Sequence, residues 1–415
     1  MSSVKSLLRY SPLAILLAVL MVVSGCSDTL MNSEVDSSET ATNPNGKIVP
    51  GDKTRHFGML DEATYTRAGK DGEETYVNLM VAYSDDGVSS QGIIDRYGII
   101  DPYGIIDRYG IIDPYGIIDR FGIIDPFGTL RDLGVLEDHG IIQRFEFTTV
   151  MDGMAITVRE DVLERFLEDI GDDSDIAFVE PDVGTSAPNG QVSELAVSTQ
   201  VTPWGVEDIG GTESSTASGD GSGSVDVDVY VLDTGTTHGD INVASCKRVE
   251  HLEDGSYELV ACETGDENGH GTAVGSVAGA VDDLDGLVGV APGVNVHAVK
   301  VLDENGSGTT GAVVAALDRI VAANDSDGDG QVDEPIVVNL SVGTDVTQAD
   351  DDGWILMDEA VKGAIDAGAV VTVAAGNAGK NASDFSPAHV NPALTVASYG
   401  KDDSFSSFSN YGSSV

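Results

Sequence analysis

Apolar residues beyond position 200 form short continuous runs, separated by longer segments with helical periodicity. We predict strands over four apolar runs and helices over two periodic segments: strands at 225–232, 294–301, 336–340 and 370–374, helices at 311–323 and 354–367. Strands without a polar face that alternate with helices are typical of a parallel sheet covered on both sides. The pattern therefore predicts an α/β domain with a parallel sheet over residues 201–415.

The middle of the chain shows a different pattern, in which apolar and polar positions alternate. Residues 76–83 are predicted to form a strand, and residues 140–158 a hairpin. An amphipathic helix over residues 159–170 and a strand over residues 176–180 follow. Strands and a helix in this order predict a small α+β unit over residues 76–183.

Six hexapeptides follow one another without a break over residues 92–127. Each begins Gly-Ile-Ile-Asp, continues with Arg or Pro in alternation, and ends with Tyr or Phe. A repeat array can form a short solenoid, in which neighbouring repeats bury a face that one repeat cannot. The recurring proline and the short unit favour the alternative, an extended insertion on the surface of the α+β unit.

The N-terminus combines Lys5 and Arg9 with an apolar run over residues 12–23. That run is shorter than a membrane span and has the layout of an export signal. The following Val23-Ser24-Gly25-Cys26 resembles the bacterial lipobox, in which the cysteine is acylated. We expect residues 1–26 to be a lipoprotein signal peptide with Cys26 as the lipidation site. The alternative is an ordinary signal peptide with an incidental cysteine.

Two polar stretches separate these parts of the chain. Residues 27–75 are rich in Ser, Thr, Asn, Asp and Gly and are expected to be a flexible tether. Residues 184–200 are expected to be an accessible linker, the natural place for a proteolytic cut.

Composition narrows the classes of partner. The chain has 70 acidic and 21 basic residues, a formal net charge of −49, which argues against binding to nucleic acid or to anionic lipid surfaces. Besides Cys26, the only cysteines are Cys246 and Cys262. Export permits a disulfide between them, and two buried free thiols are the alternative.

Three residues with catalytic side chains follow predicted strands or lie between glycines. Asp233 directly follows the strand at 225–232, His270 lies in Gly269-His270-Gly271, and Asn377 follows the strand at 370–374. Parallel α/β folds place their sites at the carboxyl ends of strands. The chain order Asp, His, Asn is the order of a hydrolase in which the nucleophilic serine comes last.

The surrounding blocks resemble those of the subtilase family, most closely its proteinase K branch. The resemblance is carried by residues 231–235, 269–272, 299–308, 374–377 and 407–412, with Trp204-Gly205 and Ser386-Pro387-Ala388 favouring the proteinase K branch. The α+β unit at 76–183 resembles the inhibitory propeptide of these proteases. The resemblance implies a serine endopeptidase precursor acting on protein or peptide substrates, with its propeptide as an intramolecular inhibitor.

The resemblance also implies a role for each site residue. Asp233 would orient His270, His270 would act as general base and then general acid, and Asn377 would donate a hydrogen bond to the oxyanion. The cleft would be lined by Leu340, Ser341, Gly343, Gly306, Ser307 and Gly308. The family's Gly-Thr-Ser block with the nucleophile would come after Val415, so we expect the 415-residue chain itself to be inactive.

The acidic loop at 325–333 has carboxylates at alternate positions and a glycine at the sixth. Asp325, Asp327, Asp329 and Asp333 are therefore predicted calcium ligands, because hard cations prefer convergent oxygens. Ile336 occupies the twelfth position, where an EF-hand has Glu, so we expect a calcium-stapled insertion rather than an EF-hand. The alternative is a solvated acidic loop. No motif indicates an organic cofactor.

The order of the parts predicts an exported precursor, anchored to the membrane through lipid on Cys26, and a mature protease that is extracellular or periplasmic. Two other classes of function stay open. One is an inactive, protease-derived binding protein in which the propeptide fold inhibits other subtilases. The other is a calcium-binding surface lipoprotein whose hexapeptide array is the contact surface.

Overall fold

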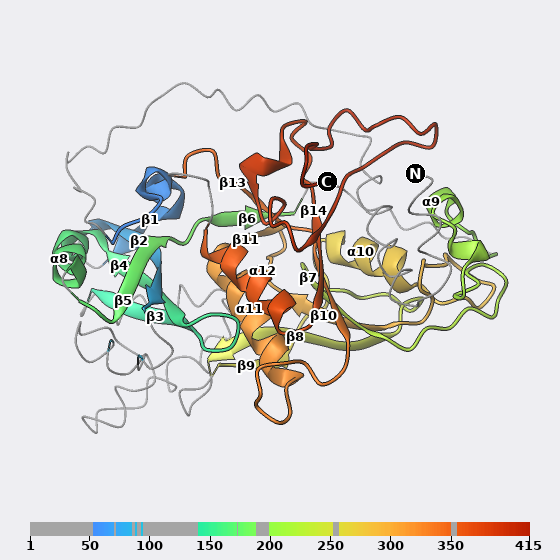
Figure 1. The fold of residues 1–415 in the computed structure, drawn as a ribbon, viewed down its shortest axis with the longest axis horizontal. Helices are drawn as coiled ribbons and strands as arrows, with labels where there is room; N and C mark the ends of the chain where they lie inside the picture. The colour runs from blue at the N-terminus through green and yellow to red at the C-terminus, as the bar shows by residue number, and fades with distance from the viewer. Residues whose placement is uncertain are drawn as a thin grey trace.

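The computed structural model describes residues 53–69, 72–84, 88, 93, 140–171, 173–187, 199–251, 257–349 and 355–415. Its elements form an N-terminal unit, residues 53–183, and a C-terminal domain, residues 199–415, joined in part by the short strand β6 (Gly184–Ser186). In Figure 1 the N-terminal unit lies at the left, and α11 and α12 separate it from the sheet of the C-terminal domain.

A five-stranded antiparallel sheet forms the N-terminal unit, with the order β1-β2-β4-β3. Both β1 and β5 pair with β2, β1 along its first half and β5 along its second. The elements are η1 (Phe57–Ala63), β1 (Thr64–Gly69), β2 (Gly72–Tyr83), β3 (Ile141–Phe147), β4 (Gly153–Arg159), α8 (Glu160–Gly171) and β5 (Ile176–Pro181). The predicted hairpin, helix and two strands correspond to β3–β4, α8, β2 and β5.

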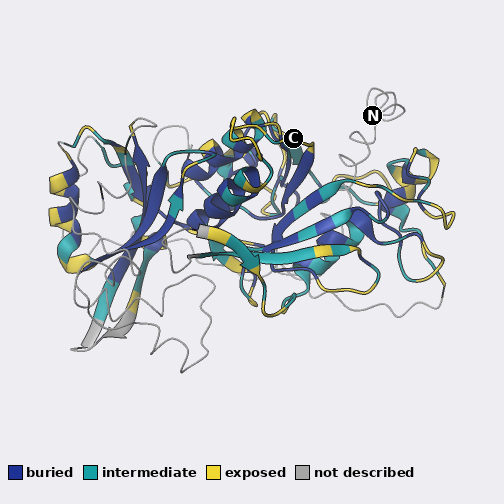
Figure 2. Ribbon diagram, turned by 90° about the horizontal axis from the view of Figure 1, so that it is seen from below, coloured by how far each residue is buried: buried dark blue, intermediate teal, exposed yellow. Residues whose placement is uncertain are grey.

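Both faces of this sheet are buried. Alternate residues of β2 and β4, such as Leu79 and Ile156, pack with the apolar stripe of α8. The intervening residues, such as Met80 and Ala155, belong to a cluster shared with α11 and α12. Figure 2 shows the result as strands that are dark blue along most of their length. A sheet buried on one side by its own helix needs the C-terminal domain to cover the other.

A seven-stranded sheet forms the centre of the C-terminal domain, with the order β16-β14-β12-β7-β10-β8-β9. Its pairs are parallel except β8–β9. The strands are β7 (Asp228–Asp233), β8 (Val243–His251), β9 (Tyr257–Ala261), β10 (Asn295–Lys300), β12 (Ile336–Leu340), β14 (Val370–Ala374) and β16 (Leu394–Val396). This arrangement confirms the predicted α/β class with a parallel sheet.

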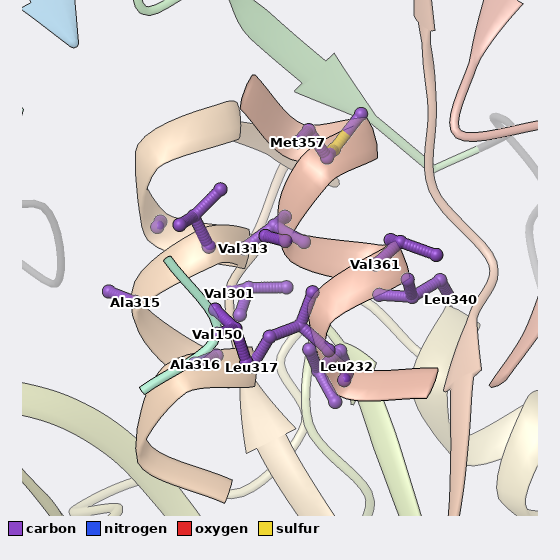
Figure 3. Packing of buried hydrophobic residues seen from close by; sticks show 14 of the residues in the cluster. Val150, Leu232, Val301, Val313, Ala315, Ala316, Leu317, Leu340, Met357 and Val361 are labelled. Atoms are coloured by element: carbon purple, nitrogen blue, oxygen red, sulfur yellow. The ribbon is translucent and has the colours of Figure 1, made fainter. Parts of the chain in front are cut away.

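Helices cover both faces of the central sheet, as the apolar strands require. On one face, α10 (His270–Gly279) packs Val274 and Ala278 against β7 and β10. On the other face lie α11 (Thr310–Ala323) and α12 (Leu356–Asp366), whose apolar residues form the largest cluster. Figure 3 shows this cluster, with Val150 from the turn between β3 and β4 lying against α11 beside Leu317.

The remaining elements are short. They are α9 (Trp204–Asp208), η2 (Gly211–Glu213), β11 (Ser307–Thr309), β13 (Thr344–Asp345), η3 (Ala382–Asp384) and β15 (Phe385–Ser386). Cys246 of β8 and Cys262 form a disulfide with a Cα–Cα distance of 5.4 Å. Among the helices of the described ranges, none has the length and hydropathy needed to cross a membrane.

The structure differs from the expectations for the tether, the linker and the hexapeptide array. The tether expected over 27–75 is wrong for residues 57–69 and 72–75, which form η1, β1 and the start of β2 in the N-terminal unit. The linker expected over 184–200 is wrong for residues 184–187, which pair with the C-terminal domain. Of the hexapeptide array only Ile93 is described, and it is buried in the core beneath α8 rather than on the surface.

Candidate active site

Asp233 and His270 meet at the carboxyl edge of the central sheet. Asp233 is the last residue of β7, and His270 is the first residue of α10. His270 Nδ1 lies 2.8 Å from Asp233 Oδ1 and 2.9 Å from Asp233 Oδ2. Asp233 is fully buried, whereas the His270 side chain keeps 13% of its surface exposed. Nδ1 of His270 is therefore hydrogen-bonded to the carboxylate of Asp233, and Nε2 is left for a second partner.

Burial of His270 disfavours its charged form, but the charge of Asp233 and the hydrogen bond between the two side chains outweigh burial. Together they raise the pKa of His270 above its ordinary value. An imidazole held in this way accepts a proton more readily than a free histidine. The pair can therefore act as a general base and its orienting carboxylate.

Glycines make the close approach of β7 and α10 possible. A Cβ at Gly271 would lie 2.0 Å from the backbone oxygen of Gly235. Gly269, which caps α10, has φ of +101°, a conformation that residues with a Cβ rarely adopt. The two glycines that flank His270 are thus required by its placement, as their position in the sequence suggested.

Asn377 follows β14 at the same edge of the sheet as Asp233, because β14, β12 and β7 are parallel neighbours. Its loop is fixed by Asn410, which is fully buried. Asn410 Oδ1 accepts hydrogen bonds from the N–H groups of Ala378 and Lys380, each at 3.0 Å, and its Nδ2 donates to Ala375 O at 2.8 Å. Sequence reasoning included Asn410 in a matching block but assigned it no role.

A segment of the chain itself occupies the predicted cleft. Strand β6 pairs with β11 in antiparallel register, Ser186 opposite Ser307 and Thr185 opposite Gly308. Ser186 N donates to Gly343 O at 3.3 Å, and Ala187 N donates to Gly306 O at 2.9 Å. Predicted cleft residues 306–308 and Gly343 therefore bind an extended backbone between two strands.

Two other predicted cleft residues lie deeper. Leu340 is fully buried within the cluster beneath α11 and α12, so it does not line the cleft. Ser341 is 4% exposed, and its Oγ accepts a hydrogen bond from Asn339 Nδ2 at 3.0 Å. Main-chain pairing with the extended segment begins only at Gly343.

Acidic residues attach the N-terminal unit to the two helices. Asp182 Oδ1 accepts from Gly311 N at 2.7 Å and from Thr310 Oγ1 at 2.8 Å, at the start of α11. Glu180 Oε1 accepts from Leu356 N at 2.8 Å, at the start of α12. Negative charge at a helix N-terminus is favourable, as for Asp182, and both carboxyl groups accept first-turn N–H groups that have no partner within the helix.

The C-terminal domain also contributes a buried acidic residue to the contact between the two parts of the chain. Asp318 of α11 is fully buried, and its Oδ1 accepts from the backbone N–H groups of Thr148, Thr149 and Val150 in the turn between β3 and β4. Sequence reasoning missed Glu180, Asp182 and Asp318. The signal in the sequence that could have identified them was a charged residue within an otherwise apolar segment.

The acidic loop brings some of the predicted ligands together. Carboxylate oxygens of Asp325, Asp327 and Asp333 lie within 4.8 Å of one another, and Asp329 is outside this group. Asp325 accepts hydrogen bonds from the N–H groups of Gly328, Asp329 and Gly330. The N–H of Gly330 contributes most to lowering the pKa of Asp325, so that carboxylate stays ionised. The lipidation candidate Cys26 lies outside the described residues.

Comparison with known proteins matches residues 225–415 to a family model described as "Subtilase family". An "Extracellular serine proteinase" of a Thermus species is 33% identical over 275 residues, which cover 64% of this chain and 57% of that protein. "Subtilisin-like protease 6" of Arthroderma benhamiae is 33% identical over 259 residues, covering 61% of this chain and 58% of that protein. The chain thus spans little more than half the length of these relatives.

A solved structure, "Crystal structure of a cold adapted subtilisin-like serine proteinase", is 34% identical in sequence. The superposition covers 46% of this chain and 60% of that chain, with a TM-score of 0.35. The fold assignment therefore rests on the sheet topology and the family match.

Proposed function

We propose that the chain, whose residues 225–415 match the subtilase family model, is part of the precursor of an exported serine endopeptidase. The single observation that carries this proposal is the contact of His270 Nδ1 with both carboxylate oxygens of buried Asp233. Its substrates are proteins or peptides bound in extended form, because the cleft residues pair with a backbone rather than enclose a small molecule.

In the proposed reaction, Asp233 accepts the Nδ1–H of His270 and so fixes the tautomer whose Nε2 can take a proton. The nucleophile would be the serine of the Gly-Thr-Ser block, which the family resemblance places on the C-terminal side of Asn377. His270 removes the proton from that serine as it attacks the peptide carbonyl, and the resulting imidazolium protonates the leaving amine. Asn377 donates its side-chain N–H to the oxyanion, a contribution of about a hundredfold or more in rate.

The N-terminal unit is proposed to act as an intramolecular inhibitor. Residues 184–187 fill the space between β11 and Gly343 as an added strand, in the place where a substrate backbone would pair. The hydrogen bonds accepted by the carboxyl groups of Glu180, Asp182 and Asp318 hold the unit on α11 and α12. Maturation then requires a cut after residue 187, and we place it within 188–199.

Calcium is proposed to bind the acidic loop. Three carboxylates within 4.8 Å of one another fit a hard divalent cation, which takes several oxygen ligands at close range. Asp325, Asp327 and Asp333 would hold the ion. The ion supplies positive charge that offsets the mutual repulsion of these carboxylates. The loop connects α11 to β12, so its order affects two elements of the core.

Export follows from the N-terminal signal, and lipid attachment at Cys26 is proposed to anchor the precursor. The relative from Thermus is named an extracellular proteinase, which supports export of this chain as well. Because Cys26 precedes the N-terminal unit, a cut within 188–199 separates the lipid from the C-terminal domain.

The decisive experiment uses an extended protein, in which a C-terminal segment with the Gly-Thr-Ser block expected from the family resemblance follows residue 415. We expect hydrolysis of a casein-type substrate, and its loss in His270→Ala. His297→Ala is the matched control, because His297 Nε2 also contacts a carboxylate, Asp228 Oδ1 at 3.1 Å, but at the opposite end of β7. Equal activity of the parent and His270→Ala would refute the proposal, and we expect His297→Ala to stay active.

A further inference from the structure

Asp266, in the loop before α10, accepts hydrogen bonds from both sides of the His270 site. Its Oδ1 accepts from Thr234 Oγ1 at 2.8 Å and from the backbone N–H groups of Asn268 at 3.0 Å and Gly269 at 2.8 Å. Its Oδ2 accepts from the backbone N–H of Thr272 at 2.8 Å and from Thr272 Oγ1 at 2.6 Å. One carboxylate therefore gathers groups from the end of β7, the loop and the first turn of α10.

Thr234 completes the connection between the two halves of the catalytic pair. It directly follows Asp233, and its Oγ1, while donating to Asp266, accepts the N–H of Gly271 at 3.0 Å. Gly271 directly follows His270. The residues next to Asp233 and His270 are thus linked through one hydroxyl, whose orientation Asp266 determines.

Charge gives Asp266 a second effect on the same site. His270 is the first residue of α10, where the positive end of the helix disfavours an imidazolium. Asp266 accepts a first-turn N–H and faces that end with a negative charge. The titratable groups that act on His270 are Asp233 from β7 and Asp266 from the loop, and both charges raise its pKa against the effect of burial. Burial opposes ionisation of Asp266, but the hydrogen bonds from Gly269 and Thr272 lower its pKa, so it stays charged.

We propose that Asp266 is a positioning residue for the general base: its ionised carboxylate joins the end of β7 to the start of α10 and places a second negative charge beside His270. The role of Asp266 in catalysis rests on the proposed function. The geometry and charge it supplies can be tested in the 415-residue chain without any peptidase activity.

The first test follows the imidazole resonances of His270 through a pH titration by NMR in the 415-residue chain, with His270→Ala identifying the signal. In Asp266→Asn we expect the pKa of His270 to shift downward, since the amide is isosteric but uncharged. Glu267→Gln is the matched control: it removes a neighbouring charge that is exposed and pairs with Lys300 at 3.0 Å. An unshifted His270 in Asp266→Asn, or an equal shift in Glu267→Gln, overturns the proposal.

The second test separates position from charge in the extended protein. Asp266→Glu keeps the negative charge but moves the carboxylate, so the pKa of His270 should stay closer to that of the parent than in Asp266→Asn. Misplacement should nevertheless lower kcat about tenfold or more, with a much smaller change in KM. An Asp266→Glu protein with parental kcat contradicts the positioning role. Inactivity of every variant and of the parent refutes the proposed function, and the NMR titration still decides the role of Asp266.

Discussion

Arg144 Nη1 donates to Asp182 Oδ2 across 2.6 Å, and both side chains are buried where β3 and the end of β5 meet α11. Asp182 also receives the N–H of Gly311 at the start of α11. Arg144 and Asp182 therefore compensate each other's charge within the N-terminal unit, and the other oxygen of the same carboxylate accepts hydrogen bonds from the start of α11. Asp182 thus connects a buried ion pair of the N-terminal unit to the C-terminal domain.

Asp182→Asn should destabilise the 415-residue chain by about 3 kcal/mol, because it leaves the Arg144 guanidinium buried without its counter-charge. Denaturant unfolding measures this change. The matched control is Asp161→Asn, which breaks the exposed ion pair of Arg159 and Asp161 at 2.5 Å and should cost about 1 kcal/mol or less. Equal losses in the two variants would contradict a buried, compensated pair.

Glu180 should make the attachment of the N-terminal unit depend on pH. Burial raises its pKa from 4.5 to about 8, and the nearby charge of Asp358 adds to that effect. A carboxyl whose pKa is higher in the folded state stabilises that state fully below pH 4.5, and the contribution is lost as pH rises through about 8. The melting temperature of the parent should therefore fall more steeply between these limits than that of Glu180→Gln.

The glutamine variant is the appropriate comparison because its amide oxygen can still accept the N–H of Leu356. His56 Nε2 lies 3.9 Å from Glu180 Oε2, and both proteins keep this histidine. Parallel melting curves of the two proteins from pH 5 to pH 9 would show that Glu180 is not the titrating group.

Chelation should lower the melting temperature of the 415-residue chain by several degrees, since removing an ion that binds only the folded state withdraws its stabilisation. Asp327→Ala should reduce this sensitivity to chelator, because Asp327 belongs to the convergent group. Asp220→Ala provides the control: Asp220 is an exposed aspartate in another loop, bound to Ser222. If chelator affects Asp327→Ala and Asp220→Ala equally, the ion is bound elsewhere.

Maturation should release the C-terminal domain from the membrane. Fractionation of cells that express the extended protein, with one tag before residue 187 and one after residue 200, should place the first with membranes and the second in the soluble fraction. Cys26→Ser should move the precursor out of the membrane fraction. A cleaved C-terminal domain that stays in the membrane fraction would contradict release.

Asp233 and His270 could be identified from the sequence because each lies in a short motif whose glycines are needed locally. The strands of the central sheet were equally visible, since β7, β10, β12 and β14 are apolar on both faces. Asn410 and Asp318 could not be identified, because their partners are backbone groups brought close only by folding. Asp266 could not be identified either, because Thr234 reaches it only in the folded chain. An aspartate whose carboxylate accepts N–H groups from distant parts of the chain cannot be told in the sequence from an aspartate whose carboxylate faces water.

The polar composition of residues 53–75 led to a wrong expectation for a physical reason. In β1, Thr64 and Tyr65 are only partly buried, and the strand pairs with β2 on one side alone. Such an edge strand is stabilised by backbone pairing and by contacts such as Tyr65 on Tyr76, with ring centroids 5.6 Å apart. It therefore lacks the apolar run by which β7 was recognised.

The central claim, that the chain is part of a protease precursor whose active site contains Asp233 and His270, predicts that the extended protein cuts itself. Mass spectrometry of the purified extended protein tests this most directly. We predict a mature fragment whose first residue lies within 189–200, because residues 184–187 are held in the cleft and the cut must follow them. The same protein with His270→Ala should remain one uncleaved chain. Cleavage of His270→Ala at the parental site and rate, or a mature fragment that begins before residue 184, would contradict the account.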